Sequence, residues 1–261
     1  MKYSLPVDIF YLPKMPPPEQ RVERDMYVLF DADLIAAPDA AFFDQEHWRH
    51  SGAMLAEASG RGAACIFKHA GKVFVLRHYR RGGLIARISA DRYLWTGLER
   101  TRAWREWKLL ALMQAAGLPV PHPIAARVQR HGVFYSADLI TRYIDGATPL
   151  ADMIAARALS LAEWGRIGMT IARFHADHIF HADLNARNIL LTDADAVYLI
   201  DFDKAKRCDP GSWQQGNLAR LRRSLDKFKA ANAGLHFDDA AWNALTAAYG
   251  AALSQGSSAS R

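Results

Sequence analysis

The architecture of this chain of 261 residues follows from two runs of sequence, HADLNARNILL at residues 181–191 and VYLIDFD at residues 197–203. Their pattern predicts a loop, a strand, a turn and a returning strand. Asp183 and Asn188 flank the loop and Asp201 ends the second strand, so we expect their oxygen-bearing side chains at one mouth of the hairpin. Hard cations prefer oxygen ligands, and the two runs therefore predict a cation site.

The predicted cation is Mg²⁺ beside a nucleotide, because Mg²⁺ keeps several waters and accepts one or two protein ligands together with substrate phosphates. Asn188 and Asp201 are its expected ligands. Asp183 lies five residues before Asn188, the spacing at which a carboxylate in the kinase catalytic loop aligns the attacking hydroxyl and accepts its proton. Asp183 is therefore the predicted catalytic base. In the alternative, these side chains make only turn and cap hydrogen bonds.

The motif His-x-Asp-Leu-x-x-x-Asn-Ile-Leu and the following Ile-Asp-Phe-Asp resemble the catalytic core of the protein-kinase-like superfamily. The resemblance implies an α+β, bilobal protein-kinase-like fold with a small β-rich N-terminal lobe and a larger helical C-terminal lobe. We expect residues 1–140 to form the first lobe and residues 141–261 the second. His181 is interpreted as a scaffold for the catalytic loop, since Asp183 already has the role of base.

Hydrophobic periodicity supports this division of the chain. Short β-like runs and one helix precede residue 140, and mainly helical spacing follows it. Pro119, Pro121 and Pro123 end the helix of the first lobe, because proline lacks the N–H donor that a helix needs. The expected elements are a hairpin of 65–69 and 72–79, a helix over 101–116, strands over 120–128 and 133–143, helices over 161–174 and 218–228, and a closing helix capped by Asp238 or Asp239.

The resemblance also implies a basic residue on the third strand that pairs with a helix glutamate and binds the ATP phosphates. Arg77 closes a strand-like run where kinases usually carry lysine, and Arg80 is the second candidate. Glu106 shares the apolar side of its helix with Leu110 and Met113. A carboxylate that faces inward requires a cation, so we predict an Arg77–Glu106 pair. In the alternative, Arg77 extends from a strand edge and Glu106 is solvated.

Two further segments are candidates for nucleotide binding. Gly60 and Gly62 belong to a turn just ahead of the hairpin, and glycines let the backbone approach a phosphate. A glycine turn without a ligand is the alternative. Residues 139–146 are the expected hinge between the lobes, where backbone groups at Tyr143 and Ile144 are the expected hydrogen-bonding partners of adenine.

Three residues depart from the pattern of kinases that act on peptides. Ala182 replaces the loop arginine, Asn185 the usual lysine and Asp203 the glycine after Asp-Phe. Resemblance to the lipopolysaccharide kinase family is instead carried by five runs: GRG (60–62), VLRHYRRGGLI (75–85), DRYL (91–94), TRAWRE (101–106) and IDFD (200–203).

The family resemblance implies a specific reaction. This is the ATP-dependent phosphorylation of the 4-hydroxyl of 3-deoxy-D-manno-octulosonic acid (Kdo) on a lipid A precursor, in lipopolysaccharide core biosynthesis. The likeness is greatest to the family members that act on Kdo. It implies an anionic glycolipid substrate, peripheral contact with acidic membrane, and a location in the bacterial cytoplasm at the inner face of the inner membrane. No obligate protein partner is inferred.

The charge distribution supports an anionic substrate. The chain carries 33 Lys and Arg against 27 Asp and Glu, a net charge of +6, and residues 77–108 carry nine basic against three acidic residues. Arg80, Arg81 and Arg87 lie near apolar residues of this segment and are candidates for contact with glycolipid or membrane. The alternative is a solvated basic face. The aromatic residues do not form a recognisable RNA-binding module, so nucleic acid is not an expected partner.

The composition excludes several other classes. An apolar fraction of 51% excludes wholesale disorder. Two distant cysteines support neither a disulfide framework nor a zinc site. We expect no secretory signal and no spanning helix, because no apolar run reaches the ~18 residues that a bilayer requires.

Two other functions remain open. A soluble small-molecule kinase of the aminoglycoside or choline type shares the loop, but it normally has an acidic pocket for cationic acceptors, which the basic segment disfavours. A pseudokinase that binds nucleotide without transferring phosphate is the second alternative. The intact set of Asp183, Asn188 and Asp201 disfavours it.

Overall fold

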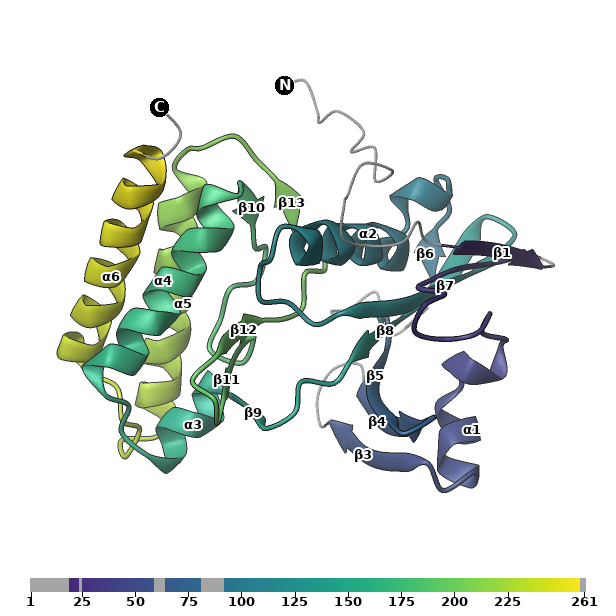
Figure 1. Ribbon diagram of the computed structural model, residues 1–261, viewed down its shortest axis with the longest axis horizontal. Helices are drawn as coiled ribbons and strands as arrows, with labels where there is room; N and C mark the ends of the chain where they lie inside the picture. The colour runs from purple at the N-terminus through teal and green to yellow at the C-terminus, as the bar shows by residue number, and fades with distance from the viewer. Residues whose placement is uncertain (1–18, 24, 59–63, 81–91, 259–261) are drawn as a thin grey trace. The chain divides into compact units, whose positions relative to one another are not determined.

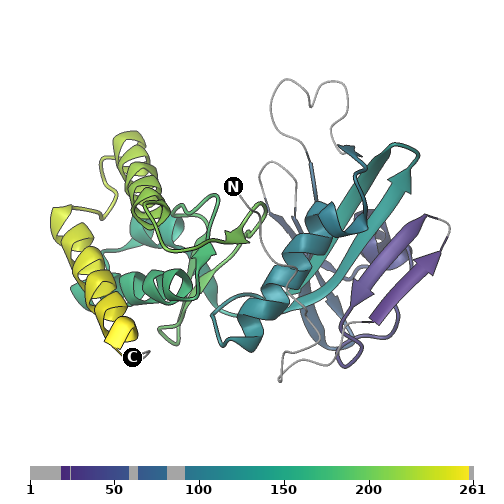
Figure 2. The same cartoon turned by 90° about the horizontal axis from the view of Figure 1, so that it is seen from above.

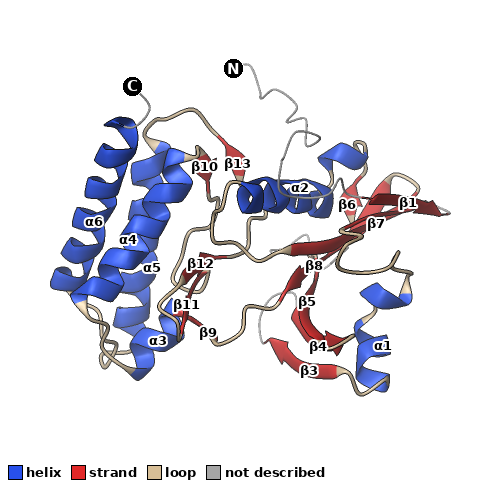
Figure 3. Ribbon diagram, in the orientation of Figure 1, coloured by secondary structure: helices blue, strands red, loops and turns tan. Residues whose placement is uncertain are grey.

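The computed structural model describes residues 19–23, 25–58, 64–80 and 92–258 (Figure 1). This part of the chain divides into two compact units. The sheet unit contains the described residues up to Ala116 together with Pro121–Tyr143, and the helical unit contains Gly117–Val120 and the described residues from Ile144 onward. Figure 3 shows most strands in the first unit and the longest helices in the second.

The sheet unit is built on one antiparallel sheet, which has eight strands among the described residues. Seven strands follow the order β1-β2-β7-β8-β5-β4-β3, and β6 pairs with β8 off this path. β5 is therefore an interior strand, with β8 and β4 as its neighbours. The strands are β1 (Glu19–Glu23), β2 (Met26–Phe30), β3 (Met54–Ala58), β4 (Ala64–His69), β5 (Lys72–His78), β6 (Tyr93–Leu94), β7 (Pro123–His131) and β8 (Phe134–Arg142).

The hairpin of β4 and β5 forms where the sequence predicts it. Ala70 and Gly71 in its turn have φ values of 48° and 75°, the left-handed conformation that matches a tight turn to the strand twist. On one face of the sheet, Phe67 stacks on Trp48 of α1 (Gln45–His50) with ring centroids 4.2 Å apart. Side chains alternate along a strand, so Arg77 lies on the opposite face of β5 from buried Leu76.

The helix predicted over residues 101–116 is α2 (Arg102–Ala115), which lies against β7 and β8 (Figure 2). Its buried side carries large apolar residues at helical spacing, among them Trp104, Trp107 and Leu110. The sequence predicts a strand from Val120, but β7 begins at Pro123. A proline can open a strand but has no N–H to donate within one.

The helical unit contains four α-helices and five short strands among the described residues. The strands form a three-stranded sheet in the order β12-β11-β9 and a separate pair of β10 with β13. The elements are β9 (Ala147–Pro149), α3 (Leu150–Ala156), α4 (Leu161–Ala176), β10 (Ile179–Phe180), β11 (Ile189–Thr192), β12 (Val197–Leu199), β13 (Lys206–Arg207), α5 (Trp213–Ala231) and α6 (Asp239–Ser258).

The helices α4 and α6 lie side by side (Figure 1). Their close approach depends on Gly168, because a Cβ atom there would stand 2.0 Å from the Leu245 carbonyl oxygen. Local signals set the helix starts: Ser160 and Glu163 form a capping box before α4, and the Asp238 carboxylate accepts from Ala241 N–H ahead of α6. The predicted starts of the helices at residue 161 and after Asp238 are thus confirmed, whereas α5 begins at Trp213, ahead of the predicted start at residue 218.

A β-rich unit and a helical unit together confirm the α+β, bilobal fold expected from the sequence. None of the helices within the described ranges combines the length and the apolar character needed to cross a membrane.

Candidate functional site

The hairpin of β11 and β12 brings the ends of the predicted catalytic segment together. Its strands pair in the register Ile189 with Leu199, and Ile200 N–H donates to the Asn188 carbonyl at 3.0 Å. Asn188 and Asp201 therefore lie at the same end of the hairpin, as the sequence predicts. The Asn188 side chain also donates through Nδ2 to the Asp183 carbonyl at 2.9 Å, so Oδ1 is the atom with which Asn188 could coordinate a cation.

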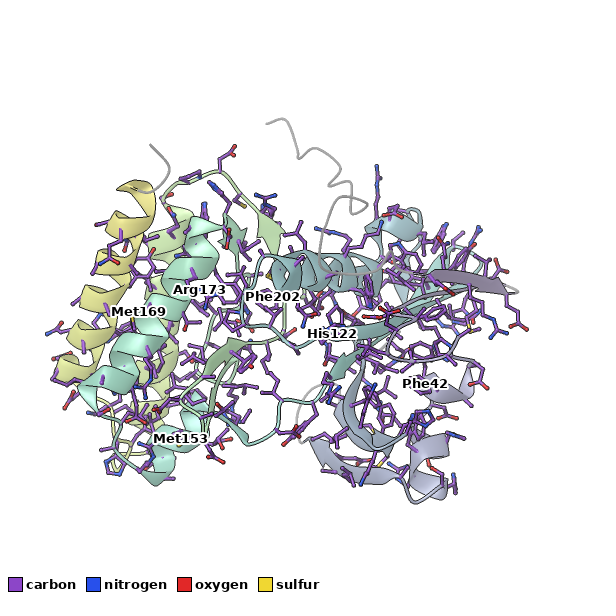
Figure 4. The ribbon with its side chains drawn as sticks, in the orientation of Figure 1. Phe42, His122, Met153, Met169, Arg173 and Phe202 are labelled. Carbon is purple, nitrogen blue, oxygen red and sulfur yellow. The ribbon has the colours of Figure 1, made fainter. Side chains whose placement is uncertain are left out.

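Asp201 has a backbone conformation that residues other than glycine rarely adopt. Its φ is 62°, in the left-handed region. The next residue, Phe202, labelled in Figure 4, is buried and stacks on Phe174 of α4 at a centroid distance of 5.7 Å. The packing of Phe202 thus holds the backbone on the C-terminal side of Asp201. A strained backbone conformation of this kind is typical of functional positions.

His181 supports the loop from the inside. Asp183 N–H donates to its Nδ1 at 3.1 Å, so the ring proton lies on Nε2 and is donated to the Ile200 carbonyl at 3.0 Å. Burial holds the pKa of His181 below its ordinary value, which keeps the ring neutral. One neutral imidazole therefore positions both the Asp183 and the Asp201 ends of the site, and its interpretation as a scaffold is confirmed.

The loop is also attached to α5, a relationship that sequence analysis missed. Residues at helical spacing on α5 contact successive loop residues, in the same order along the helix and the loop. Asn217 exchanges hydrogen bonds with the His181 backbone, Arg220 pairs with Asp183, Ser224 Oγ accepts from Ala186 N–H, and Phe228 lies under the Arg187 guanidinium. The spacing of these residues in the sequence indicates that they share one face of a helix, but it does not show which segment that face contacts.

The Asp183 carboxylate is exposed on the loop. Its side chain is 58% exposed, and its Oδ1 accepts from Arg220 Nη1 at 3.2 Å. The residues around it are fixed, since the Asn185 side chain both donates to the Asp183 carbonyl and accepts from Arg187 N–H. An exposed carboxylate on a fixed backbone is suited to accept a proton from a bound hydroxyl.

In the sheet unit, Arg77 of β5 pairs with Glu106 of α2. The Glu106 side chain is 3% exposed and also accepts from the Tyr79 hydroxyl at 2.5 Å. Arg77 belongs to an interior strand, opposite Leu139 of β8. The predicted pair is therefore present, and the alternative of an edge arginine with a solvated glutamate is wrong.

Two backbone hydrogen bonds bear on the expected adenine contacts. Tyr143 N–H donates to the Val73 carbonyl at 3.1 Å, and Arg142 N–H donates to the His122 carbonyl at 2.8 Å. These two donors are used within the sheet unit, because Arg142, the last residue of β8, bonds to the residue before β7, and Tyr143 continues the pairing with β5. An adenine contact at Tyr143 is thus restricted to its carbonyl group.

The other predicted residues are placed as follows. Arg80 is exposed two residues after the end of β5. Gly60, Gly62, Arg81 and Arg87 lie outside the described residues.

The donor set at the hairpin mouth suits Mg²⁺. Within the described ranges, no group of three or more His, Cys, Asp or Glu side chains could hold a metal by itself. Asn188 and Asp201 offer two oxygen ligands, and Mg²⁺ usually takes few from protein and completes its shell with phosphate oxygens and water.

A pocket of about 230 Å³ in the helical unit has Arg157, Glu163, Arg166 and Asp195 in its lining. These charged side chains pair with one another, Arg157 with Glu163 and Arg166 with Asp195.

Comparisons with known proteins point to one family. The model of the lipopolysaccharide kinase (Kdo/WaaP) family matches residues 45–249 of the chain. A 3-deoxy-D-manno-octulosonic acid kinase of Photobacterium profundum is 38% identical over 85% of this chain and 94% of its own length. A protein of the same name from Vibrio cholerae is 40% identical over 77% of this chain and 85% of its own length. Another from Haemophilus influenzae is 38% identical over 87% of this chain and 97% of its own length.

Proposed function

Because the chain belongs to the lipopolysaccharide kinase (Kdo/WaaP) family, we propose that it transfers the γ-phosphoryl group of ATP to the 4-hydroxyl of Kdo on a lipid A precursor. The protein is thus a phosphotransferase of lipopolysaccharide core biosynthesis that acts on a sugar hydroxyl. The observation that carries this proposal is the fixed loop on which Asp183 is accessible and Asn188 and Asp201 share one end of a hairpin.

In the proposed reaction, Asp183 aligns the acceptor hydroxyl and takes its proton. The hydroxyl oxygen forms a bond to Pγ, the bond from Pγ to the bridging oxygen of ADP breaks, and ADP leaves with the electron pair. His181 and Asn188 hold the backbone of Asp183 during this step. The protein therefore promotes the reaction mainly by positioning the reacting groups and by placing charge beside them.

Asn188 and Asp201 would hold the magnesium ion. The ion would supply positive charge beside the β- and γ-phosphates. The hydrogen bond from Nδ2 to the Asp183 carbonyl orients the Asn188 amide for this purpose. Asp201 is positioned by its left-handed backbone and by the anchored Phe202.

Arg77 is proposed to bind ATP phosphates. A guanidinium is a planar fork that holds phosphate oxygens bidentately, whereas lysine acts as a point charge. Buried Glu106 fixes the direction of the fork through the ion pair. Glu106 therefore acts on ATP through Arg77.

The finer features of the substrate are also proposals. Arg80, Arg81 and Arg87 belong to the basic segment 77–108 and are proposed to contact phosphates and sugar carboxylates of the glycolipid at the cytoplasmic face of the inner membrane. Gly60 and Gly62 are proposed to approach the ATP phosphates, and the Tyr143 carbonyl and Ile144 to contact adenine.

The deciding experiment incubates the full chain with labelled ATP, Mg²⁺ and a Kdo-lipid A precursor. We expect labelled lipid from the wild-type protein, and a fall in turnover of roughly two or more orders of magnitude in Asp183→Asn with ATP affinity largely kept. Full retention of ATP with no labelled lipid would support the binding-only alternative. Phosphorylation of a soluble cationic acceptor instead would support the small-molecule kinase. Unchanged turnover in Asp183→Asn would remove that residue from the mechanism.

A further inference from the structure

Arg220 is the cation that the structure places against the proposed catalytic base. Its Nη1 donates to Asp183 Oδ1 at 3.2 Å, across 37 positions of sequence. The two side chains are 49% and 58% exposed. An ion pair this exposed adds little to stability, so folding alone gives no strong reason for it. Both partners are accessible to a bound substrate.

The other attachments of the loop to α5 are of a different kind. Asn217 and Ser224 bond to the loop backbone, and Phe228 packs beneath Arg187. These contacts fix the course of the loop. Only Arg220 contacts the carboxylate of Asp183 itself, so among these four side chains it is the one suited to act on the charge at the reaction centre.

Phosphoryl transfer at this loop brings two negative groups together. The Asp183 carboxylate must come within hydrogen-bonding distance of the attacking hydroxyl, and the γ-phosphoryl group, which carries negative charge on its oxygens, must approach the same hydroxyl. The two anions repel each other unless a cation lies between or beside them. The loop has a neutral residue at Asn185, whose side chain is already bonded to the loop backbone.

We propose that Arg220 neutralises this repulsion, pairing with Asp183 and binding oxygens of the phosphoryl group in transit. The inference rests on the proposed function, because it requires Asp183 to be the base. Arg220 transfers no proton: the proton of the hydroxyl goes to Asp183 while the new O–P bond forms and the bond to ADP breaks. A guanidinium can contact a carboxylate and a phosphate at once, since its donors form a fork.

The test compares Arg220→Gln and Arg220→Lys with Arg223→Gln, a matched control at another exposed arginine of α5. For Arg220→Gln we expect kcat to fall about 10- to 100-fold, since a single arginine that stabilises transferring phosphate can contribute more than this. The KM for ATP should change less than about threefold, because Asn188, Asp201 and Arg77 are untouched. Arg220→Lys should keep most of the activity, and Arg223→Gln should equal wild type.

Two results would overturn the inference. One is wild-type kcat in Arg220→Gln. The other is an equal loss in Arg220→Lys and Arg220→Gln together with a lowered unfolding temperature, which would make Arg220 a packing residue. Asp183→Asn separates the two proposals: if it is inactive while Arg220→Gln is fully active, the proposed function stands and this inference fails. If Asp183→Asn is active, the proposed function fails first.

Discussion

The Glu106 carboxylate of α2 is buried and forms an ion pair with Arg77 of β5, while the Tyr79 hydroxyl donates to the same carboxylate. The carboxylate thus links a helix to an interior strand and determines the direction of the arginine.

Glu106→Gln should weaken ATP binding more than it slows the chemical step. The amide keeps the size of the side chain but removes the charge that orients Arg77, so we expect KM for ATP to rise about tenfold. Removing one partner of a largely buried pair should also lower the free energy of unfolding by roughly 1–3 kcal/mol. Steady-state kinetics and denaturant unfolding measure the two effects, with Glu99→Gln, an exposed glutamate, as control. An unchanged KM for ATP would contradict the proposed role of the pair.

Asp201→Asn should remove the proposed cation ligand without changing the backbone conformation at this position. Asparagine tolerates the left-handed φ of 62° found at Asp201, so the unfolding temperature should stay near that of wild type. The lost carboxylate should raise the Mg²⁺ concentration needed for half-maximal activity at least tenfold. A magnesium titration of activity checks this, and an unchanged midpoint would exclude Asp201 as a ligand.

Stability should decrease as the pH falls below neutrality, partly through His175. Burial lowers the pKa of His175 to about 4, and its ring is bonded to Tyr249 and Asn217. The unfolded chain binds a proton near its ordinary pKa of 6.5, whereas the folded chain does not until about pH 4. The contribution of His175 to the free energy of unfolding is therefore fully present above about pH 6.5. It is lost as the pH falls from there to about 4, by up to roughly 3 kcal/mol. Unfolding temperatures at several pH values should show a shallower slope in His175→Gln.

Two glycines on α4 should respond in opposite ways to alanine. A Cβ at Gly168 would stand 2.0 Å from the Leu245 carbonyl oxygen, so Gly168→Ala must push α6 away and should cost about 1–3 kcal/mol or more. At Gly165 the nearest atom would be Ala248 Cβ at 3.5 Å, an ordinary contact. Gly165→Ala should therefore be neutral or stabilising through helix propensity. Equal unfolding temperatures in the two variants would contradict the observed packing.

The proposed membrane association should depend on the basic segment. Each arginine near an anionic surface contributes about 1 kcal/mol, so Arg80→Glu with Arg81→Glu should reduce binding to anionic vesicles at least tenfold. A flotation assay at low and high salt measures this binding. Arg223→Glu with Lys227→Glu, a pair of exposed charges on α5, is the matched control. Equal losses in both double variants would show that net charge alone drives the binding.

Local hydrogen bonding explains why much of the site could be predicted. Asp183 and Asn188 are joined within one loop, and the hairpin of β11 and β12 has a four-residue turn at residues 193–196, so spacing along the chain sets their proximity. The Arg77–Glu106 pair could be expected for a similar reason, because an inward carboxylate at an apolar helix position requires a cation. The conformation of Asp201 was not predictable, since neighbouring packing at Phe202 stabilises it.

The strands β1, β2 and β3 lie outside the strands predicted from the sequence. β2 gains its place through pairing with β7, about a hundred residues away, so its partner is decided by the sheet and not by its own pattern.

What the amino-acid sequence determined by itself is the chemistry: which carboxylates, which amide and which arginine are available, and how short-range spacing arranges the loop. The tertiary structure alone decided what surrounds that chemistry, above all the placement of Arg220 beside Asp183 and of Asn217 beneath His181. A helix such as α5 offers several faces with polar residues, and only packing against the rest of its unit selects the face that meets the loop.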